Sequence, residues 1–156
     1  MRILVVSDSH SDRASLRMAL ASINAEAYIF LGDGYRDWES LIPYMNCQRL
    51  IAVKGNNDWG CEYPLSLTER IGGKLIYCTH GHSVGVQFNL LGLEDKAREA
   101  EADIALYGHT HEPNVTYKDG LYMMNPGSVR KNSCGIIDIT PKGIMCFTRK
   151  IVSYKP

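Results

Sequence analysis

The five histidines of this sequence lie in three short stretches, and each stretch follows an apolar run. His10 belongs to the first stretch, His80 and His82 to the second, and His109 and His111 to the third. Imidazole nitrogens bind borderline divalent metal ions, and two ligands separated by one residue can reach one ion from the same side. Because no histidine lies elsewhere in the chain, we interpret the three stretches as parts of one metal site.

Aspartate and asparagine supply oxygen ligands to the same site. Asp8 precedes His10 by two residues, Asp33 follows a second apolar run, and Asn56 and Asp58 follow a third. Carboxylate and amide oxygens complement imidazole around divalent ions, and the two oxygens of one carboxylate suit Asp33 to bridge two ions. Two ions about 3.5–4 Å apart hold the attacking and leaving oxygens in phosphoryl transfer. Each pair alone is typical of an ordinary loop, whereas the combination indicates a dinuclear metal centre.

Five apolar runs must form the strands that bring these residues together. Their continuous, β-branched apolar composition is typical of buried parallel strands. In an open α/β sheet, ligands bind at the carboxyl ends of the strands, which is where the polar residues follow. The expected strands cover residues 2–7, 27–31, 49–53, 74–79 and 103–107.

Helices alternate with the strands in the first half of the chain, which predicts parallel pairing with right-handed crossovers. We expect a helix over about 12–24 with Ser11 as its N-cap. A polar and aromatic loop should follow the second strand, and then a short helix over 37–46 that is interrupted or ends near Pro43. A further helical region spans about 84–101.

The second half of the chain has shorter strands separated by turns. Gly72-Gly73 predicts a hairpin between a strand at 65–71 and the strand at 74–79. From this order of elements we predict one α/β domain over residues 1–156, with two packed sheets and helices outside. The tail is expected to form a β-meander with strands at 114–117, 121–124, 135–139 and 144–151.

Composition narrows the classes of function. The 17 basic residues balance the 17 acidic residues, so no broad basic surface for extended nucleic acid or an anionic membrane is indicated. No apolar run approaches the roughly 20 residues of a membrane span, and the N-terminus has no signal-peptide pattern. The five cysteines show no Cys-x-x-Cys spacing, which favours reduced thiols in a cytoplasmic protein. Cys78 lies two residues before His80, but a cysteine in an apolar strand is more typical of inert packing than of a nucleophile.

The order of the motifs resembles the calcineurin-like metallophosphoesterase superfamily. The motifs are Asp-x-His, Gly-Asp, Gly-Asn-x-Asp, Thr-His-Gly-His and Gly-His-Thr-His, in that order. Within the superfamily, the sequence is most similar to the small phosphodiesterases of the YfcE type, including their turn at Asn125-Pro126-Gly127-Ser128. The resemblance covers nearly the whole chain and implies a four-layer α/β/β/α sandwich, with two mixed sheets packed face to face and helices outside.

The resemblance implies a metal-dependent phosphoesterase, and more specifically a phosphodiesterase that acts on a small phosphoester. A hydroxide bound to two metal ions would attack phosphorus in line, without a covalent enzyme intermediate. Manganese (Mn2+) is the usual ion of the family, and Ni2+, Zn2+, Fe2+ or Mg2+ substitute for it. Whether the chain forms a homo-oligomer stays open. One implied ligand set is Asp8, His10, Asp33 and His111, and the other is Asp33, Asn56, His80 and His109.

One position departs from the family pattern. Many members of the superfamily carry a histidine that assists the leaving group where this sequence has Asn57, and the YfcE type usually has cysteine there. An amide cannot deliver a proton, so we expect a steep dependence of rate on leaving-group pKa, unless His82 replaces the missing acid. Asp58 is expected to orient His10 or another ligand. The catalytic candidates are Asp33, Asn56, His82 and Asp58.

The sequence leaves two alternatives open. The chain could be a non-catalytic scaffold or binding protein, as the related retromer subunit is, although that subunit has lost ligating histidines and this sequence keeps every ligand position. The aromatic residues Tyr35, Trp38 and Trp59 either stack on an aromatic or nucleoside group of the substrate or pack under the loops or at a subunit interface. In the first case Arg36 is available for a phosphate. A nuclease is disfavoured because the sequence shows no extended basic stripe.

Overall fold

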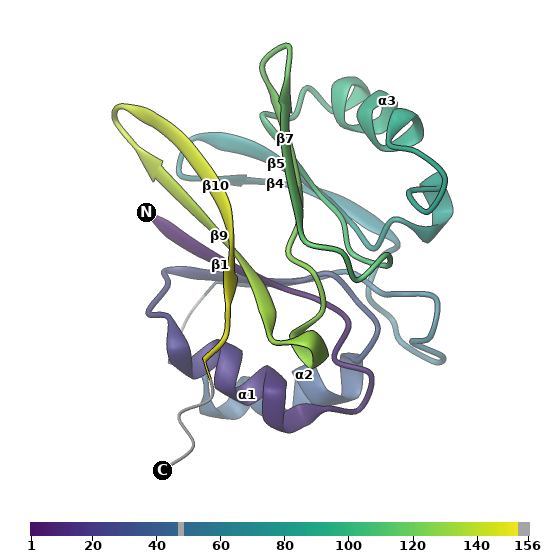
Figure 1. Cartoon of the computed structure of the whole chain (residues 1–156), viewed down its shortest axis with the longest axis vertical. Helices are drawn as coiled ribbons and strands as arrows, with labels where there is room; N and C mark the ends of the chain where they lie inside the picture. Colours follow the sequence, from purple (N-terminus) through teal and green to yellow (C-terminus); the bar gives the residue numbers. More distant parts are fainter. Residues whose placement is uncertain (47–48, 153–156) are drawn as a thin grey trace.

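The computed structural model describes residues 1–46 and 49–152, and these form two five-stranded sheets (Figure 1). In sheet A, β1 pairs in parallel with β2 and β2 with β3, whereas β9 runs antiparallel to β1 and β10. The three parallel strands therefore have their carboxyl ends at one edge. Sheet A has the order β10-β9-β1-β2-β3, with β1 (Arg2–Val6), β2 (Ala27–Phe30), β3 (Leu50–Ala52), β9 (Ser133–Thr140) and β10 (Gly143–Lys150).

Sheet B is mixed in the same way. Its strands β5, β6 and β8 are parallel, and β4 and β7 pair antiparallel at the two edges. The predicted hairpin at Gly72-Gly73 is confirmed, because these two glycines join β4 to β5. Sheet B has the order β4-β5-β6-β8-β7, with β4 (Ser66–Ile71), β5 (Lys74–Thr79), β6 (Ile104–Leu106), β7 (Asn114–Lys118) and β8 (Leu121–Asn125).

Helices cover the outer faces of both sheets. In Figure 1, α1 and α2 lie below sheet A, and α3 lies beside sheet B on the opposite side of the molecule. Their apolar residues pack into separate outer clusters, whereas the facing sides of the two sheets share a third, central cluster. The expected four-layer α/β/β/α sandwich is thus confirmed. The helices are α1 (Arg13–Ser22), α2 (Tyr35–Leu41) and α3 (Leu91–Glu99), with short 3-10 turns η1 (Ile42–Tyr44), η2 (His82–Val84) and η3 (Val129–Lys131).

Strand β1 shows how the sequence builds these layers. Ile3 and Val5 join the central cluster between the sheets, and Leu4 and Val6 join the outer cluster under α1. Because both faces are covered, the strand is apolar throughout instead of alternating with polar residues. Full burial of each aliphatic side chain contributes about 1.5–3 kcal/mol. The loop that follows β1 therefore starts from a firmly held strand.

Two helix starts differ from the prediction. The N-cap of α1 is Asp12 and not Ser11, because the Asp12 carboxylate accepts hydrogen bonds from the backbone N–H and the hydroxyl of Ser15 at 3.0 and 2.8 Å. Helix α2 begins at Tyr35, inside the predicted loop, and gives way to η1 at the predicted position, with Pro43 inside η1. The region predicted as helical at about 84–101 contains α3 only in its later part.

The expected β-meander in the tail is wrong. β7 and β8 form a hairpin in sheet B, but β9 and β10 form a hairpin in sheet A. The chain crosses between the sheets at Asn125-Pro126-Gly127-Ser128, where proline and a positive φ at Gly127 end the strand. Consecutive antiparallel strands look alike in sequence whether the chain stays in one sheet or changes to the other.

Candidate metal centre

The seven expected ligands lie on loops that leave the carboxyl ends of five strands, two in sheet B and three in sheet A. The loops of the two sheets meet directly, because the backbone N–H of His109 donates to Oδ2 of Asp8 at 3.2 Å. The structure therefore brings together residues that are about 100 positions apart in the sequence. Sheet A supplies Asp8, His10, Asp33 and Asn56, and sheet B supplies His80, His109 and His111.

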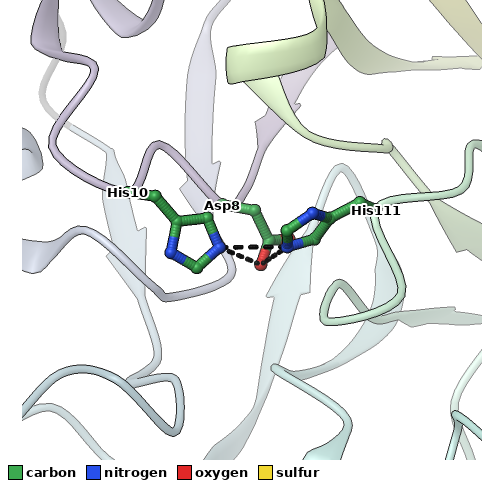
Figure 2. A group of neighbouring side chains, drawn as sticks. All are labelled: Asp8, His10 and His111. Atoms are coloured by element: carbon green, nitrogen blue, oxygen red, sulfur yellow. Dashed lines mark hydrogen bonds and ion pairs between the residues drawn. The ribbon is translucent and has the colours of Figure 1, made fainter.

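Figure 2 shows Asp8, His10 and His111 with their polar atoms turned toward one another. Nε2 of His111 lies 3.2 Å from Oδ1 of Asp8 and 3.0 Å from Nε2 of His10. Nε2 of His10 lies 3.6 Å from the same Asp8 oxygen. One ligand atom from each residue lies within 4.8 Å of the others, so the three can share one ion.

A second group consists of Asp8, Asp33 and His80. Nε2 of His80 lies 3.4 Å from Oδ2 of Asp33, 3.9 Å from Oδ1 of Asp8 and 3.1 Å from Oδ1 of Asn56. Nδ1 of this buried ring donates to the carbonyl oxygen of Leu31 at 2.7 Å, since a carbonyl only accepts. That bond fixes the ring and leaves Nε2 facing the oxygens, which is the usual support behind a metal-binding histidine.

The donor set fits a divalent cation because one buried oxygen lacks a partner. Among the described residues, Oδ1 of Asp8 makes no hydrogen bond, although three imidazole nitrogens surround it. The Nε2 atoms of His10, His80 and His111 lie 3.6, 3.9 and 3.2 Å from this oxygen. An unsatisfied buried acceptor costs about 1–3 kcal/mol, and more when it is charged. A cation among these atoms removes that cost, and carboxylate with imidazole suits manganese, iron or zinc.

The backbone of the site adopts a conformation that the sequence did not reveal. Asp8, His10, Asp33, His109 and His111 all have positive φ, between 45° and 69°. A residue with a Cβ pays of order 1–3 kcal/mol for such a conformation, which persists only where surrounding structure fixes it. These five residues are the majority of the nine non-glycine residues with positive φ in the described chain. Strain therefore concentrates on the residues expected to bind metal.

At two strand ends, a glycine allows the backbone to lie very close to a neighbouring side chain. A Cβ on Gly55 would lie 2.1 Å from Oδ1 of Asp33, and one on Gly108 would lie 2.2 Å from Oγ of Ser7. Both distances are far below a normal contact, so a side chain at either glycine would displace the loops that carry Asp33 and Asp8.

The Asn125–Ser128 turn connects two of the ligand loops, a role that the motif alone did not disclose. Nδ2 of Asn125 donates to the carbonyl of Gly108 at 2.9 Å and to Oγ1 of Thr110 at 3.0 Å. Oγ of Ser128 donates to the carbonyl of Asp8 at 2.7 Å. The crossing between the sheets thus ties the loop of sheet B to the loop of sheet A.

Asn57 contacts the carboxylate that was expected to bridge two ions. Its backbone N–H donates to Oδ1 of Asp33 at 2.8 Å, and its side-chain amide donates to Oδ2 at 2.6 Å. Burial opposes ionisation of Asp33, but His80 and the hydrogen bonds from Asn57 outweigh it, so the pKa of Asp33 lies well below its usual range. For His80, burial opposes the charged ring, yet the carboxylates of Asp33 and Asp8 raise its pKa above the ordinary value.

Asp58 was expected to orient either His10 or another ligand, and its carboxylate makes no hydrogen bond to His10. Its carboxylate is buried and accepts four backbone hydrogen bonds. Oδ2 accepts from Asp33 and Gly55 at 2.7 and 2.8 Å, and Oδ1 accepts from Gly34 and Tyr35 at 2.7 and 3.0 Å. Asp58 therefore fixes the loop of Asp33, in line with the alternative that it orients another expected ligand.

His82 and His109 lie beside the two groups. The ring of His109 is 5.3 Å from that of His80, and the ring of His82 is 5.5 Å from His80 and 6.2 Å from His109. Burial, followed by the positive charge on His80, lowers the pKa of both residues. Nδ1 of His82 is buried and has no hydrogen-bond partner among the described residues. His82 thus has a free polar atom next to the cluster without being one of its closely spaced ligands.

The profile of the calcineurin-like phosphoesterase superfamily domain matches residues 1–140. The chain belongs to this superfamily. The match includes every loop of the candidate metal centre, and it agrees with the resemblance stated from the sequence motifs. Metal dependence is a property of the superfamily, and the structure supplies residues that could hold the metal.

Curated relatives of the superfamily carry two kinds of name. The chain is 32% identical over 130 residues to the "probable metallophosphoesterase YsnB" of Bacillus subtilis, which covers 83% of this chain and 76% of the relative. It is 28% identical over 156 residues to the "phosphodiesterase YfcE" of Escherichia coli, a match that covers 83% of this chain and 79% of the relative. It is also 34% identical over 136 residues to "vacuolar protein sorting-associated protein 29" of Schizosaccharomyces pombe, a match that covers 82% of this chain and 72% of the relative. Enzyme names and a protein-sorting name therefore both occur among the relatives.

The solved structures confirm the superfamily fold. A crystal structure from Streptococcus pneumoniae, described as a conserved protein and predicted phosphoesterase, has a TM-score of 0.74 and 28% identity. The similarity covers 95% of this chain and 97% of that chain. None of the helices in the part of the chain that the structure describes has the length and apolar character of a membrane span.

The two tryptophans of the chain differ in exposure to solvent. Trp38 is 1% exposed and stacks on Phe30 with ring centroids 5.3 Å apart, so of the two alternatives left open for the aromatic residues, packing applies to Trp38. Trp59 is 82% exposed and lines a cavity beside the metal centre. The difference follows from α2, which turns Trp38 toward the sheet, whereas Trp59 lies in the loop after β3.

The cysteines form no disulfide among the described residues, and Cys47 lies outside those residues. Cys78 is fully buried in β5 within the central cluster, and burial raises the pKa of its thiol far above the ordinary value. The thiol is therefore protonated and enclosed, which supports the packing interpretation over a nucleophilic one.

Proposed function

We propose that this protein is a metal-dependent phosphodiesterase that hydrolyses small phosphodiesters. The observation that carries the proposal is the buried Oδ1 of Asp8, which lacks a hydrogen bond and lies among the imidazole nitrogens of His10, His80 and His111. Superfamily membership supports a phosphoesterase, and the name of the Escherichia coli relative supports the choice of phosphodiesters.

The proposed cofactor is a pair of divalent ions, with manganese as the expected metal. Such ions activate water and neutralise phosphoryl oxygens in a displacement at phosphorus. Asp33 is proposed to serve both ions, because its Oδ2 lies 3.7 Å from Nε2 of His10 and 3.4 Å from Nε2 of His80. The proposed ligands of one ion are Asp8, His10, Asp33 and His111, and those of the other are Asp33, Asn56, His80 and His109.

The chain itself contributes orientation and charge. The hydrogen bond from His80 to the Leu31 carbonyl holds the ring, and the bonds to Asp33 from Asn57 hold the carboxylate in its ionised form. Because the Asn57 amide is directed to Asp33, we assign contact with the leaving oxygen to His82, whose Nδ1 has no protein partner among the described residues. Asp58 is proposed to act only through the Asp33 loop.

A non-catalytic scaffold is the second candidate, because the protein-sorting relative is 34% identical. The protein would then bind a partner protein through the same fold. The close grouping of Asp8 with three histidines supports a bound metal ion, which the enzyme requires, and the hydrolysis assay distinguishes the two candidates. A cytoplasmic, single-domain protein over residues 1–156 agrees with the free thiols and with the central cluster that both sheets form.

The experiment is hydrolysis of bis(p-nitrophenyl) phosphate by the full chain with Mn2+, with EDTA, and with metal added back. We expect activity that EDTA removes and Mn2+ restores. Asp8→Asn should abolish it, whereas the control Asp95→Asn, an exposed aspartate on α3, should retain it. Wild-type protein that binds metal yet leaves the diester intact would contradict the enzyme and favour the scaffold.

A further inference from the structure

A cavity of about 410 Å³ lies beside the metal centre and reaches residues that the proposed hydrolysis does not use. Its lining includes His10 and Asp33 of the centre, Tyr35 and Arg36 from the first turn of α2, and Trp59 from the loop after β3. This volume lies within the range of about 300–1,000 Å³ typical of small-molecule sites. The cavity therefore has room for a part of the substrate other than the scissile phosphate.

The indole of Trp59 is exposed on a backbone that is held in place. Its carbonyl accepts a hydrogen bond from the hydroxyl of Tyr35 at 3.3 Å, and the preceding residue, Asp58, is anchored by four backbone N–H groups. The side chain nevertheless remains 82% exposed. An exposed indole on a backbone that is held in place, at the wall of a cavity, offers an aromatic face for stacking on a flat ring.

Arg36 supplies positive charge to the same cavity. Its Nε donates to the hydroxyl of Tyr35 at 3.1 Å, and its guanidinium lies 5.7 Å from the centroid of the Tyr35 ring. Among the described residues, Arg36 forms no ion pair with a carboxylate. A guanidinium has five N–H donors, so donors remain for an anionic ligand.

Besides Asp33 of the metal centre, the cavity wall contains two carboxylates that accept hydrogen bonds from the protein. Asp58 accepts its four backbone hydrogen bonds, and Asp37 accepts one from the hydroxyl of Ser9 at 2.6 Å. They therefore offer little to a ligand. Arg36 is the one lysine or arginine among the described residues that line the cavity, and the exposed Trp59 lines the same cavity.

We propose that this cavity binds the nucleoside that is the non-leaving group of a phosphodiester, with the base stacked on Trp59, and that Arg36 at its wall binds a non-bridging oxygen of the phosphodiester itself. The inference rests on the proposed phosphodiesterase activity, and it names the substrate class. Stacking on one indole tolerates any base, since every base has a π-face. The site therefore selects nucleosides as a class over alkyl groups.

Binding is tested first, by tryptophan fluorescence of the full chain during titration with adenosine monophosphate and with adenosine. Trp59 and Trp38 are the two tryptophans of the chain, and with Trp38 1% exposed the signal change reports on Trp59. We expect saturable quenching that Trp59→Phe removes. Arg36→Gln should weaken binding of the monophosphate and leave that of adenosine unchanged. Quenching that persists in Trp59→Phe would overturn the proposal.

Selectivity is tested with two diesters that share the p-nitrophenolate leaving group. In thymidine 5′-(p-nitrophenyl phosphate) the non-leaving group is a nucleoside, and in p-nitrophenyl ethyl phosphate it is an alkyl group. In both reactions the oxygen of water bonds to phosphorus, the bond from phosphorus to the aryl oxygen breaks, and p-nitrophenol and a phosphomonoester result. We expect Trp59→Ala to lower the ratio of the two kcat/KM values roughly 5- to 150-fold, the loss typical of one base–aromatic stack.

The matched control is Tyr44→Ala, an aromatic residue that is 79% exposed and lies outside the cavity. It should leave the ratio unchanged. An unchanged ratio in Trp59→Ala would overturn the proposal, as would an equal change in the control. A changed oligomeric state with an unchanged ratio would assign Trp59 to a contact between copies of the chain. If the wild type hydrolyses neither diester, the phosphodiesterase proposal fails, whereas the fluorescence titration still tests the cavity.

Discussion

Replacing Asp58 by asparagine tests the role that the structure gives this residue. Each carboxylate oxygen accepts two backbone N–H groups, at distances between 2.7 and 3.0 Å. In Asp58→Asn one oxygen becomes an NH2 group, which faces two donors and can accept from neither. Turning the amide over does not help, because either orientation loses two of the four bonds. A hydrogen bond to a charged group contributes about 1.5–3 kcal/mol, so the variant should lose about 3–6 kcal/mol of unfolding free energy.

The assay is urea-induced unfolding followed by circular dichroism, in EDTA so that metal binding does not contribute. Because small domains are stable by about 5–15 kcal/mol in total, the expected loss is a large fraction of the stability. The control is Glu62→Gln, an exposed acid four residues further along the same loop, which should change stability by less than about 0.5 kcal/mol. A loss below about 1 kcal/mol in Asp58→Asn would mean that the four hydrogen bonds contribute little to stability, contrary to the role assigned to Asp58.

Three further outcomes are expected. Asp33→Asn should lower kcat more than roughly 100-fold and weaken Mn2+ binding, beyond the loss of about 10–100-fold typical of residues that only support a ligand; near-normal kcat with two bound ions would contradict this. Trp38→Ala should destabilise the fold by about 3–5 kcal/mol in urea unfolding, whereas Trp59→Ala should cost less than about 0.5 kcal/mol, and similar costs would contradict their assigned environments. Hydrogen bonds from Arg2 hold the pKa of Asp138 below its usual value, so the pair stabilises the fold above about pH 4 and loses that effect as pH falls through the lowered pKa. The difference in unfolding free energy between wild type and Asp138→Asn should therefore shrink on acidification, and a difference that grows instead would contradict the sign.

The sequence predicted the strands of the site well because burial leaves a direct mark on composition. A strand covered on both faces must be apolar throughout, and the polar residue that ends it is then conspicuous. Apolar runs of this kind precede Asp8, Asp33 and His80, and the structure has a strand in each of them. Local composition therefore sufficed to predict which loops carry the candidate ligands.

Other features depend on contacts that local sequence does not encode. Ser11 and Asp12 are both good N-cap residues, and only the geometry of Ser15 relative to Asp12 decides between them. Trp38 and Trp59 likewise follow similar polar motifs, and their opposite burial results from the helix that contains Trp38. The side-chain amide of Asn57 binds Asp33 because two separate loops meet, which no spacing in the sequence reveals.

Anomalous diffraction from a crystal of the Mn2+-loaded protein, measured at the manganese absorption edge, would locate any metal ions bound among the expected ligands. We expect two peaks, one among Asp8, His10 and His111 and one beside Asn56 and His80, with Asp33 near both. The Asp33→Asn protein, crystallised in the same way, should lose at least one of them. Absence of both peaks in the wild type at saturating Mn2+, or peaks away from these side chains, would contradict the assignment of this site as the metal centre.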